Sequence, residues 1–186
     1  MKTCTVIAGV SGCGKSSFIG VLISQCPDIG PVIDTEELAA EKGGTRQETI
    51  KDSTSLQERL LREGVTHAVE TTLRGKREKN MIRQAKRSGY FVRMAYIGVS
   101  GMRECLTRIE KRVAKGGHNV PDEEVYWQHK KRWEDLSEVI NYCNEVRFFD
   151  NENGFVEIAE YANGELISKG NYRPGWLLEL VEILEK

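Results

Sequence analysis

Residues 5 to 16 read Thr-Val-Ile-Ala-Gly-Val-Ser-Gly-Cys-Gly-Lys-Ser, and the prediction of the fold starts from them. An apolar run that suits a β-strand leads directly into the pattern Gly-x-x-x-x-Gly-Lys-Ser, and an amphipathic run over residues 17–23 follows it. The glycines let the backbone curl so that successive N–H groups point into one concavity, and a helix that starts near Lys15 adds its positive dipole end. The pattern predicts a phosphate-binding loop between a strand and a helix; the alternative is a glycine-rich turn without a ligand.

Such a loop predicts contacts to a nucleoside triphosphate and to Mg²⁺. Lys15 would bring a cation to the terminal phosphates, and the Ser16 hydroxyl can bind the metal. Cys13 is either a tolerated loop residue or an oxidation-sensitive thiol. The residues expected to contact the nucleotide are Gly9, Ser11, Gly12, Cys13, Gly14, Lys15, Ser16 and Ser17.

Composition limits the class of protein. The chain has 186 residues, a formal net charge of −1 and 30% charged residues, so its length suits one domain and it has no global basic field that calls for nucleic acid or a membrane. The five cysteines show no CxxC spacing, which favours a reducing compartment. We find neither a signal peptide nor an apolar run long enough to span a membrane, and therefore expect a cytoplasmic protein.

Apolar runs alternate with helical patterns along the chain, which predicts an α/β fold with a parallel sheet flanked by helices. Gly64 and Gly89 stand where two of the helices should end. The expected strands are Thr3–Ala8, Pro31–Ile33, His67–Glu70, Phe91–Val99 and Val146–Phe149, and the expected helices are Lys15–Gln25, Arg46–Arg62, Lys76–Ser88, Met102–Ala114 and Asp122–Asn144.

The helix expected over Met102–Ala114 makes two further predictions. Its apolar spacing places Met102, Leu106, Ile109 and Val113 on one buried stripe. Arg108 and Arg112 are four residues apart, so they share a neighbouring face and can reach into the same cleft.

The C-terminal part has a different pattern. Residues 155–161 alternate with period two, Asn163-Gly164 suits a type I′ turn, and residues 165–168 return, which together predict a β-hairpin. A final helix is expected over Pro174–Glu185. We treat residues 1–186 as a single domain, in which the hairpin and helix of about residues 152–186 extend or cover the edge of the sheet.

Acidic residues follow the second expected strand. Asp34, Glu36 and Glu37 come directly after it, and in open α/β sheets ligands bind at the carboxyl edge. A carboxylate there can take a proton from a substrate hydroxyl or hold the water shell of Mg²⁺. Alternatively, Asp34 caps the next helix and the two glutamates occupy its first turn.

Two more segments carry candidate site residues. The third strand ends in Glu70-Thr71-Thr72-Leu73-Arg74, where Glu70 and Arg74 suit substrate or metal contacts and either threonine could cap the following helix. Residues 112–121 read Arg-Val-Ala-Lys-Gly-Gly-His-Asn-Val-Pro, which is typical of a mobile flap with cations on its stem. An arginine on such a flap can neutralise charge on a transferred phosphoryl group. His118 either contacts substrate or forms a local hydrogen bond.

Taken together, the Gly-Lys-Ser loop, the acidic end of the second strand, the Val-Glu-Thr-Thr-Leu-Arg-Gly segment and Arg-Val-Ala-Lys-Gly-Gly-His-Asn-Val-Pro resemble the zeta-toxin-like P-loop kinases. The resemblance covers about residues 3–151. It implies a kinase core with a helical lid at about residues 112–132, and ATP or GTP with Mg²⁺. It also implies phosphoryl transfer to a hydroxyl of a small molecule, such as the nucleotide sugar UDP-N-acetylglucosamine. Some members are toxins neutralised by an antitoxin, so an antitoxin-like protein partner is a further expectation.

The resemblance implies a role for individual residues. The catalytic set would be Lys15 on the β and γ phosphates, Glu36 as the base and Arg112 as the lid arginine, with Ser16 on the metal. The resemblance places Glu70 and Thr72 on the substrate side, and the strand ends and the flap add Asp34, Arg74 and His118 as further substrate-binding candidates.

The chain departs from the family at two positions. The family's base is normally Asp, so either Glu36 adapts or Asp34 acts in its place. An Arg-Arg-Tyr cluster that often follows the flap is replaced by Tyr126-Trp127-Gln128-His129-Lys130-Lys131-Arg132, with Lys131 or Arg132 as a displaced substitute for the second lid arginine.

Two functions from different classes follow. The first is an ATP-dependent phosphotransferase. The alternative is a nucleotide-dependent binding module, a kinase fold with degraded chemistry that acts through a protein partner. Phosphorylation of nucleic-acid 5′-hydroxyls is disfavoured, because the net charge is −1 and no basic track is present.

Overall fold

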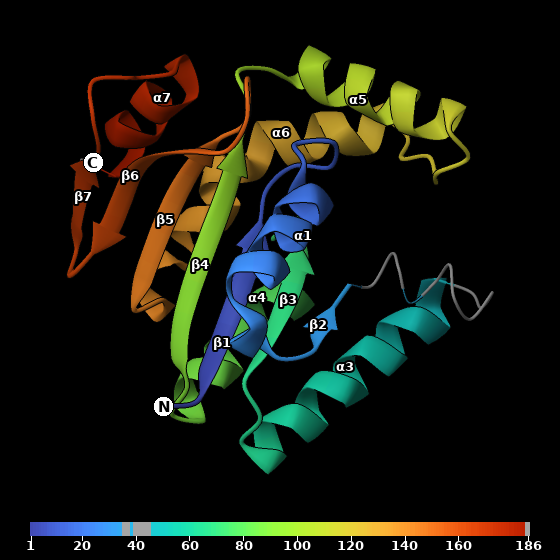
Figure 1. Cartoon of the computed structure of the whole chain (residues 1–186), viewed down its shortest axis with the longest axis vertical. Helices are drawn as coiled ribbons and strands as arrows, with labels where there is room; N and C mark the ends of the chain where they lie inside the picture. The colour runs from blue at the N-terminus through green and yellow to red at the C-terminus, as the bar shows by residue number, and fades with distance from the viewer. Residues whose placement is uncertain (35–37, 39–45, 185–186) are drawn as a thin grey trace.

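The computed structural model describes residues 1–34, 38 and 46–184. Its strands form one sheet in the order β2-β3-β1-β4-β5-β6-β7 (Figure 1). Neighbouring strands are parallel from β2 to β5, whereas β6 and β7 join in antiparallel pairs. The strands are β1 (Thr3–Ala8), β2 (Val32–Ile33), β3 (His67–Thr71), β4 (Phe91–Gly98), β5 (Glu145–Asp150), β6 (Val156–Ala162) and β7 (Glu165–Ser168).

Helices cover both faces of this sheet. Helix α1 lies on one face, α4 and α6 lie on the other, and α5 lies beyond the carboxyl ends of the central strands (Figure 1). Within the described residues, none of the helices is both long enough and apolar enough to cross a membrane. The helices are α1 (Lys15–Gln25), α3 (Arg46–Glu63), α4 (Lys76–Arg87), α5 (Met102–Ala114), α6 (Asp122–Ser137) and α7 (Gly175–Leu184), with short 3₁₀ turns at Pro27–Ile29 and Ile140–Tyr142.

The central strand β1 explains why the core has two parts. Cys4, Val6 and Ala8 point to the face covered by α3, α4, α6 and α7, whereas Ile7 points to the face covered by α1 and α5. Each of these four residues is at most 1% exposed. A parallel strand that is buried on both faces needs a continuous apolar run, as residues 6–8 provide, and Thr5 is buried with them.

The α/β fold is confirmed, but one predicted helix is too long. The expected helix Asp122–Asn144 ends as α6 at Ser137. Asn144 instead pairs with β4, because its N–H donates to the Val92 carbonyl at 2.7 Å and its Oδ1 accepts the Val92 N–H at 3.0 Å. The Asn144 N–H therefore does not make the helical hydrogen bond to the carbonyl four residues earlier.

The predicted apolar stripe of α5 is wrong at its last position. Ile109 is buried, as is Cys105, but Val113 is 39% exposed. Met102 and Leu106 are half-buried and pack against the core. The final turn of α5, which includes Val113, extends past the sheet (Figure 1).

The C-terminal hairpin is confirmed. Asn163 and Gly164 have φ angles of 54° and 86°, the left-handed pair that a type I′ turn requires. The hairpin extends the edge of the sheet beyond β5. Trp176 of α7 is buried and its ring approaches β4 so closely that a Cβ on Gly98 would lie 2.5 Å from it.

Candidate functional site

The turn between β1 and α1 has the curl that its glycines predict. Gly12 and Gly14 have φ angles of 83° and 105°. A Cβ on Gly12 would lie 2.4 Å from the Cys105 carbonyl oxygen, and one on Gly14 would lie 2.3 Å from Asn151 Nδ2. Both the backbone conformation and the lack of space therefore require glycine at these positions.

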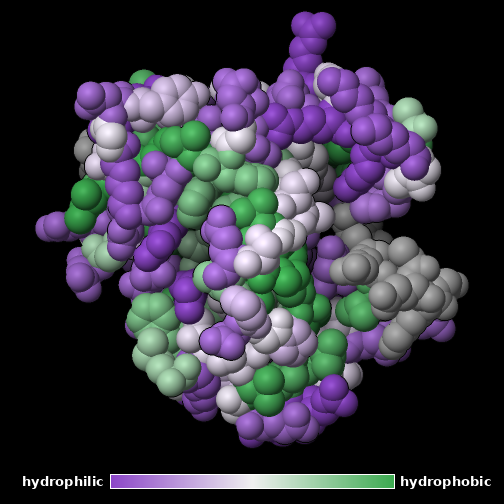
Figure 2. All heavy atoms as spheres, viewed as in Figure 1, coloured by the Kyte–Doolittle hydropathy of each residue, from purple (hydrophilic) through white to green (hydrophobic). Residues whose placement is uncertain are grey.

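A cavity of about 520 Å³ lies between this turn and α5. Its volume falls in the range of small-molecule sites. Figure 2 shows hydrophilic side chains gathered over α5. Among the described residues, the charged side chains that line the cavity are five basic ones and one carboxylate: Lys15, Arg108, Lys111, Arg112, Lys115 and Glu70. This surplus of positive charge, with backbone N–H groups of the turn nearby, suits a polyanion.

Lys15, Ser16 and Glu70 meet at the floor of the cavity. Lys15 is 6% exposed, and its Nζ lies 3.6 Å from Glu70 Oε1. The Ser16 hydroxyl donates to Glu70 Oε2 at 3.2 Å. Strand β3 therefore delivers its terminal carboxylate to the two residues on which the sequence places phosphate and metal.

These oxygen atoms determine which metal suits the site. The Ser16 hydroxyl and the Glu70 carboxylate are hard ligands of the kind that Mg²⁺ prefers. No cluster of three or more His, Cys, Asp or Glu side chains occurs in the part of the chain that the structure describes. Mg²⁺ commonly keeps several waters and takes one or two protein ligands together with substrate phosphates, so a pair of oxygen donors is sufficient.

The phosphate-loop turn is held from outside by two side chains. Arg108 donates from NH1 to the Cys13 carbonyl at 3.4 Å and from NH2 to the Asn151 carbonyl at 2.6 Å, while its Nε pairs with Glu104 at 2.7 Å. Asn151 Nδ2 also donates to the Cys13 carbonyl, at 2.8 Å. The turn is thus fixed between α5 and the segment after β5. The sequence pattern placed Arg108 beside a cleft, but it predicted no role for Asn151 in holding the loop.

The Cys13 thiol faces away from solvent. It is 1% exposed, and burial raises its pKa, an effect that the nearby Lys15 ammonium opposes only in part. The reactive form of a cysteine is the thiolate, so a buried protonated thiol reacts slowly. This favours the tolerated loop residue over the oxidation-sensitive switch.

Helix α6 also touches the turn. Gln128 is 3% exposed, and its Oε1 accepts the Ser11 N–H at 2.8 Å. The sequence pattern predicted no role for Gln128. In the sequence, the one indication for Gln128 is its position on the inward face of a helix that follows the flap.

The segment after β3 has an unusual backbone. Leu73 has a φ of 62°, which is rare for a bulky residue, and it is 1% exposed. Its N–H donates to the Thr71 hydroxyl at 2.9 Å. Core burial and this hydrogen bond hold the strained turn, which leaves Thr72 half-buried and Arg74 exposed. Arg74 NH1 lies 3.9 Å from Glu124 Oε1 of α6.

The structure brings together only part of the predicted site. Lys15, Ser16, Glu70 and Arg112 line the cavity with Ser11, Gly12, Gly14 and Ser17. Glu36 and Glu37 lie outside the described residues, so the structure does not distinguish Glu36 from Asp34 as the base. Six predicted residues are described but do not line the cavity: Gly9, Cys13, Asp34, Thr72, Arg74 and His118.

Comparison with solved structures identifies the fold. The chain aligns over 99% of its length with 63% of a chain in the crystal structure of AvrRxo1-ORF1:-ORF2 with ATP, at a TM-score of 0.69 and 16% identity. It aligns over its full length with 85% of a chain of the PezAT toxin-antitoxin system of Streptococcus pneumoniae, at a TM-score of 0.61 and 18% identity. The fold is that of a zeta-toxin-like P-loop kinase. A putative kinase from Chloroflexus aurantiacus matches 70% of the chain and 79% of its own, at a TM-score of 0.56 and 13% identity.

Sequence comparison reaches less far. No family model matches the sequence. A stretch of 69 residues is 29% identical to an uncharacterized protein of Haemophilus influenzae. The matched stretch makes up 37% of this chain and 49% of that protein. The chain thus matches about half the length of this relative, and it spans 63% of the AvrRxo1 complex chain.

Proposed function

We propose that this protein is a phosphotransferase that uses ATP or GTP with Mg²⁺ to phosphorylate a hydroxyl of a small molecule. The observation that carries the proposal is the meeting of Lys15, Ser16 and Glu70 at a cation-rich cavity beside a glycine turn. A zeta-toxin-like P-loop kinase fold supports it. In this proposal residues 1–186 act as one domain, with a lid at about residues 112–132.

The donor side uses the residues that line the cavity. Backbone N–H groups of residues 12–16 would surround the phosphates, and Lys15 and Arg112 would neutralise charge on the transferred group. Ser16 would bind Mg²⁺, with Glu70 acting directly or through water. When bound there, Mg²⁺ would supply positive charge that reduces the repulsion between the phosphate oxygens and the attacking oxygen.

The acceptor side uses the carboxyl edge of β2 and β3. An acceptor hydroxyl would lose its proton to a carboxylate of Glu36 or Asp34 as its oxygen bonds to the γ-phosphorus. The bond from that phosphorus to the bridging oxygen breaks, and the nucleoside diphosphate leaves. Contacts to the acceptor are assigned to Asp34, Glu70, Thr72, Arg74 and His118. A nucleotide sugar such as UDP-N-acetylglucosamine is the first candidate to test.

Incubation with Mg-ATP and a panel of hydroxyl compounds, read by mass spectrometry, tests this proposal. We expect a product 80 Da heavier than one acceptor, roughly the mass that a phosphoryl group adds, and its loss in Lys15→Ala. The matched control is Lys51→Ala, which removes an exposed lysine of α3 and should leave the rate unchanged. Equal rates for Lys15→Ala and the parent would contradict the proposed mechanism.

A second candidate is a binding module that acts through a protein partner. Arg108, a lining cation, is already engaged by Glu104 and by two carbonyls, so it serves the fold as well as the cavity. Two of the solved neighbours come from two-component assemblies, the AvrRxo1-ORF1:-ORF2 complex and the PezAT system. Tight nucleotide binding without any product across the panel would favour this candidate, and co-purification of an antitoxin-like protein would support it.

A further inference from the structure

One hydrogen bond connects the lid helix directly to the backbone of the phosphate loop. Gln128 of α6 accepts the Ser11 N–H through Oε1 at 2.8 Å, although the two residues are 117 positions apart. Both residues are buried, Gln128 at 3% and Ser11 at 4% exposure. A buried amide N–H that loses its acceptor is costly, so this bond constrains the loop more than an exposed one would.

The same face of α6 reaches the segment after β3. Glu124 precedes Gln128 by four residues, so the two side chains lie on one face of the helix. Glu124 Oε1 lies 3.9 Å from Arg74 NH1. A single helical face therefore contacts both the phosphate loop and the segment that the proposed function assigns to the acceptor.

The other end of α6 is anchored elsewhere. Asp135 accepts from Lys79 of α4 at 2.6 Å, and Arg132 pairs with Glu179 of α7. These contacts fix the second half of the helix to the body of the fold. In its first half, Gln128 accepts the hydrogen bond from the loop, and buried Val125 belongs to the same apolar cluster as Val10 and Cys13 of that loop.

We propose that Gln128 is a positioning residue that keeps the phosphate loop in its curled form and links that loop to the acceptor side through α6. The inference rests on the proposed function. A loop that is already curled does not have to be ordered when a nucleotide binds, so affinity is higher. Removal of the acceptor atom should weaken nucleotide binding about tenfold, the order expected when the competent form falls to about a tenth of the population.

Hydrogen exchange at the Ser11 amide tests the positioning role without any ligand. In Gln128→Met, which keeps the volume but removes the acceptor, exchange should become at least about tenfold faster, because this bond protects the amide. Gln128→Glu restores an acceptor at the same reach and should restore protection. The side chain in Gln128→Asn is one methylene shorter, so this variant should not restore protection of the Ser11 amide. The control Lys130→Met changes the exposed face of the same helix and should leave exchange unchanged. If the Ser11 amide remains as protected from exchange in Gln128→Met and Gln128→Asn as in the parent, the proposal is overturned. If one of these variants does not fold, the result from the other decides.

A titration with Mg-ATP separates this proposal from the proposed function. We expect the parent and Lys130→Met to bind equally, and Gln128→Met to bind about tenfold more weakly. Equal binding by the parent and Gln128→Met overturns the positioning role alone. A folded parent that binds no nucleotide overturns both proposals.

Discussion

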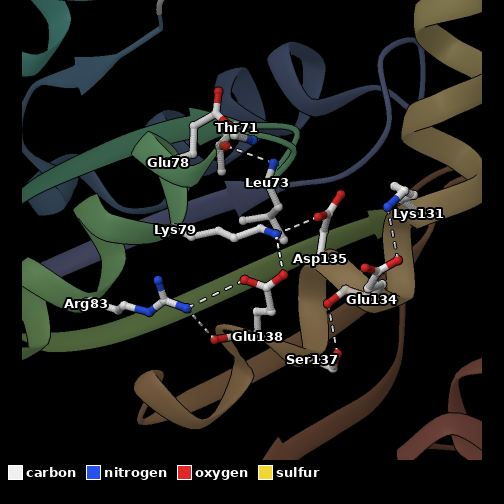
Figure 3. A network of polar contacts seen from close by, with 11 residues as sticks. Thr71, Leu73, Glu78, Lys79, Arg83, Lys131, Glu134, Asp135, Ser137 and Glu138 are labelled. Carbon is white, nitrogen blue, oxygen red and sulfur yellow. Dashed lines mark hydrogen bonds and ion pairs between the residues drawn. The ribbon is translucent and has the colours of Figure 1, made fainter.

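Two buried lysine–carboxylate clusters lie in different parts of the fold, and they differ in how closely the lysine approaches its carboxylates. Around Lys79, Nζ lies 2.6 Å from Asp135 Oδ1 and 2.8 Å from Glu138 Oε1, while Arg83 approaches Glu138 at 3.7 Å (Figure 3). Around Lys15, Nζ lies 3.6 Å from Glu70 Oε1, beyond hydrogen-bonding distance. Only the second cluster borders the 520 Å³ cavity.

The pKa of Lys79 shows what a closed cluster does. Burial alone would lower this pKa, but the hydrogen bonds that Lys79 donates to Asp135 and Glu138 outweigh burial and raise it. The cluster ties α4 to α6 with its charges satisfied internally. Lys15 Nζ donates to the Val10 carbonyl at 3.4 Å, and Lys15 lines a cavity whose other charged side chains are mostly basic. The same residue types therefore brace the fold in one place and prepare a site for an anion in the other.

The largest expected effect is that of Lys15→Met on chemistry. Phosphoryl transfer should fall by at least about a hundredfold, because the change removes a cation aimed at the transferred group. Stability should stay within about 1 kcal/mol of the parent, since the change also relieves repulsion among the basic residues around the cavity. Steady-state kinetics and denaturant unfolding measure the two quantities. If Lys15→Met loses stability but keeps its rate of phosphoryl transfer, Lys15 would brace the fold, the role that we assign to Lys79.

Lys79→Met should produce the opposite pattern. Removal of one partner leaves Asp135 buried without its ammonium, and the free energy of unfolding should fall by about 3 kcal/mol. Activity per folded molecule should be retained at a temperature where the variant is folded. The double variant Lys79→Met/Asp135→Leu is the control, because removal of both charges should recover much of the loss. A double variant no more stable than the single one would contradict this account of the cluster.

Glu70→Gln sharpens the comparison at the site itself. The amide keeps the shape but binds Mg²⁺ poorly, so the Mg²⁺ concentration needed for nucleotide binding should rise about tenfold. Nucleotide titrations at several MgCl₂ concentrations measure this shift. Glu63→Gln, at an exposed position in the last turn of α3, should show no change. An unchanged Mg²⁺ requirement in Glu70→Gln would remove Glu70 from the metal site.

The smallest expected effect concerns acid stability. The hydrogen bond from Lys79 lowers the pKa of the Glu138 carboxyl below its ordinary value of 4.5. A lowered folded-state pKa contributes stability that is present above the unfolded value and is lost as the pH falls through the folded one. The parent should therefore lose slightly more stability than Lys79→Met as the pH drops below about 4.5. The effect is small because Glu138 is 45% exposed, and melting temperatures across this range measure it. A steeper loss in Lys79→Met would contradict the assignment.

Local patterns predicted the fold well because each pattern had a local cause. The Gly-Lys-Ser loop, the two-face burial of β1 and the Asn163-Gly164 turn all follow from residues close together in the sequence. The end of α6 could not be predicted in this way. It depends on Asn144 pairing with β4, a contact across 52 residues.

The site was predicted less completely than the fold. The sequence identified Lys15, Ser16, Glu70 and Arg112, which line the cavity together. The contacts that hold the loop join Gln128 to Ser11 and Asn151 to Cys13, over 117 and 138 residues. Such pairs arise only when distant elements pack, and no motif in the chain marks them.

Calorimetric titration with Mg-ATP tests most directly the claim that the open lysine cluster binds the ligand and the closed one braces the fold. The account predicts saturable binding of one nucleotide per chain by the parent and by folded Lys79→Met, and loss of that binding in Lys15→Met. Binding that survives Lys15→Met but is lost in folded Lys79→Met would contradict it.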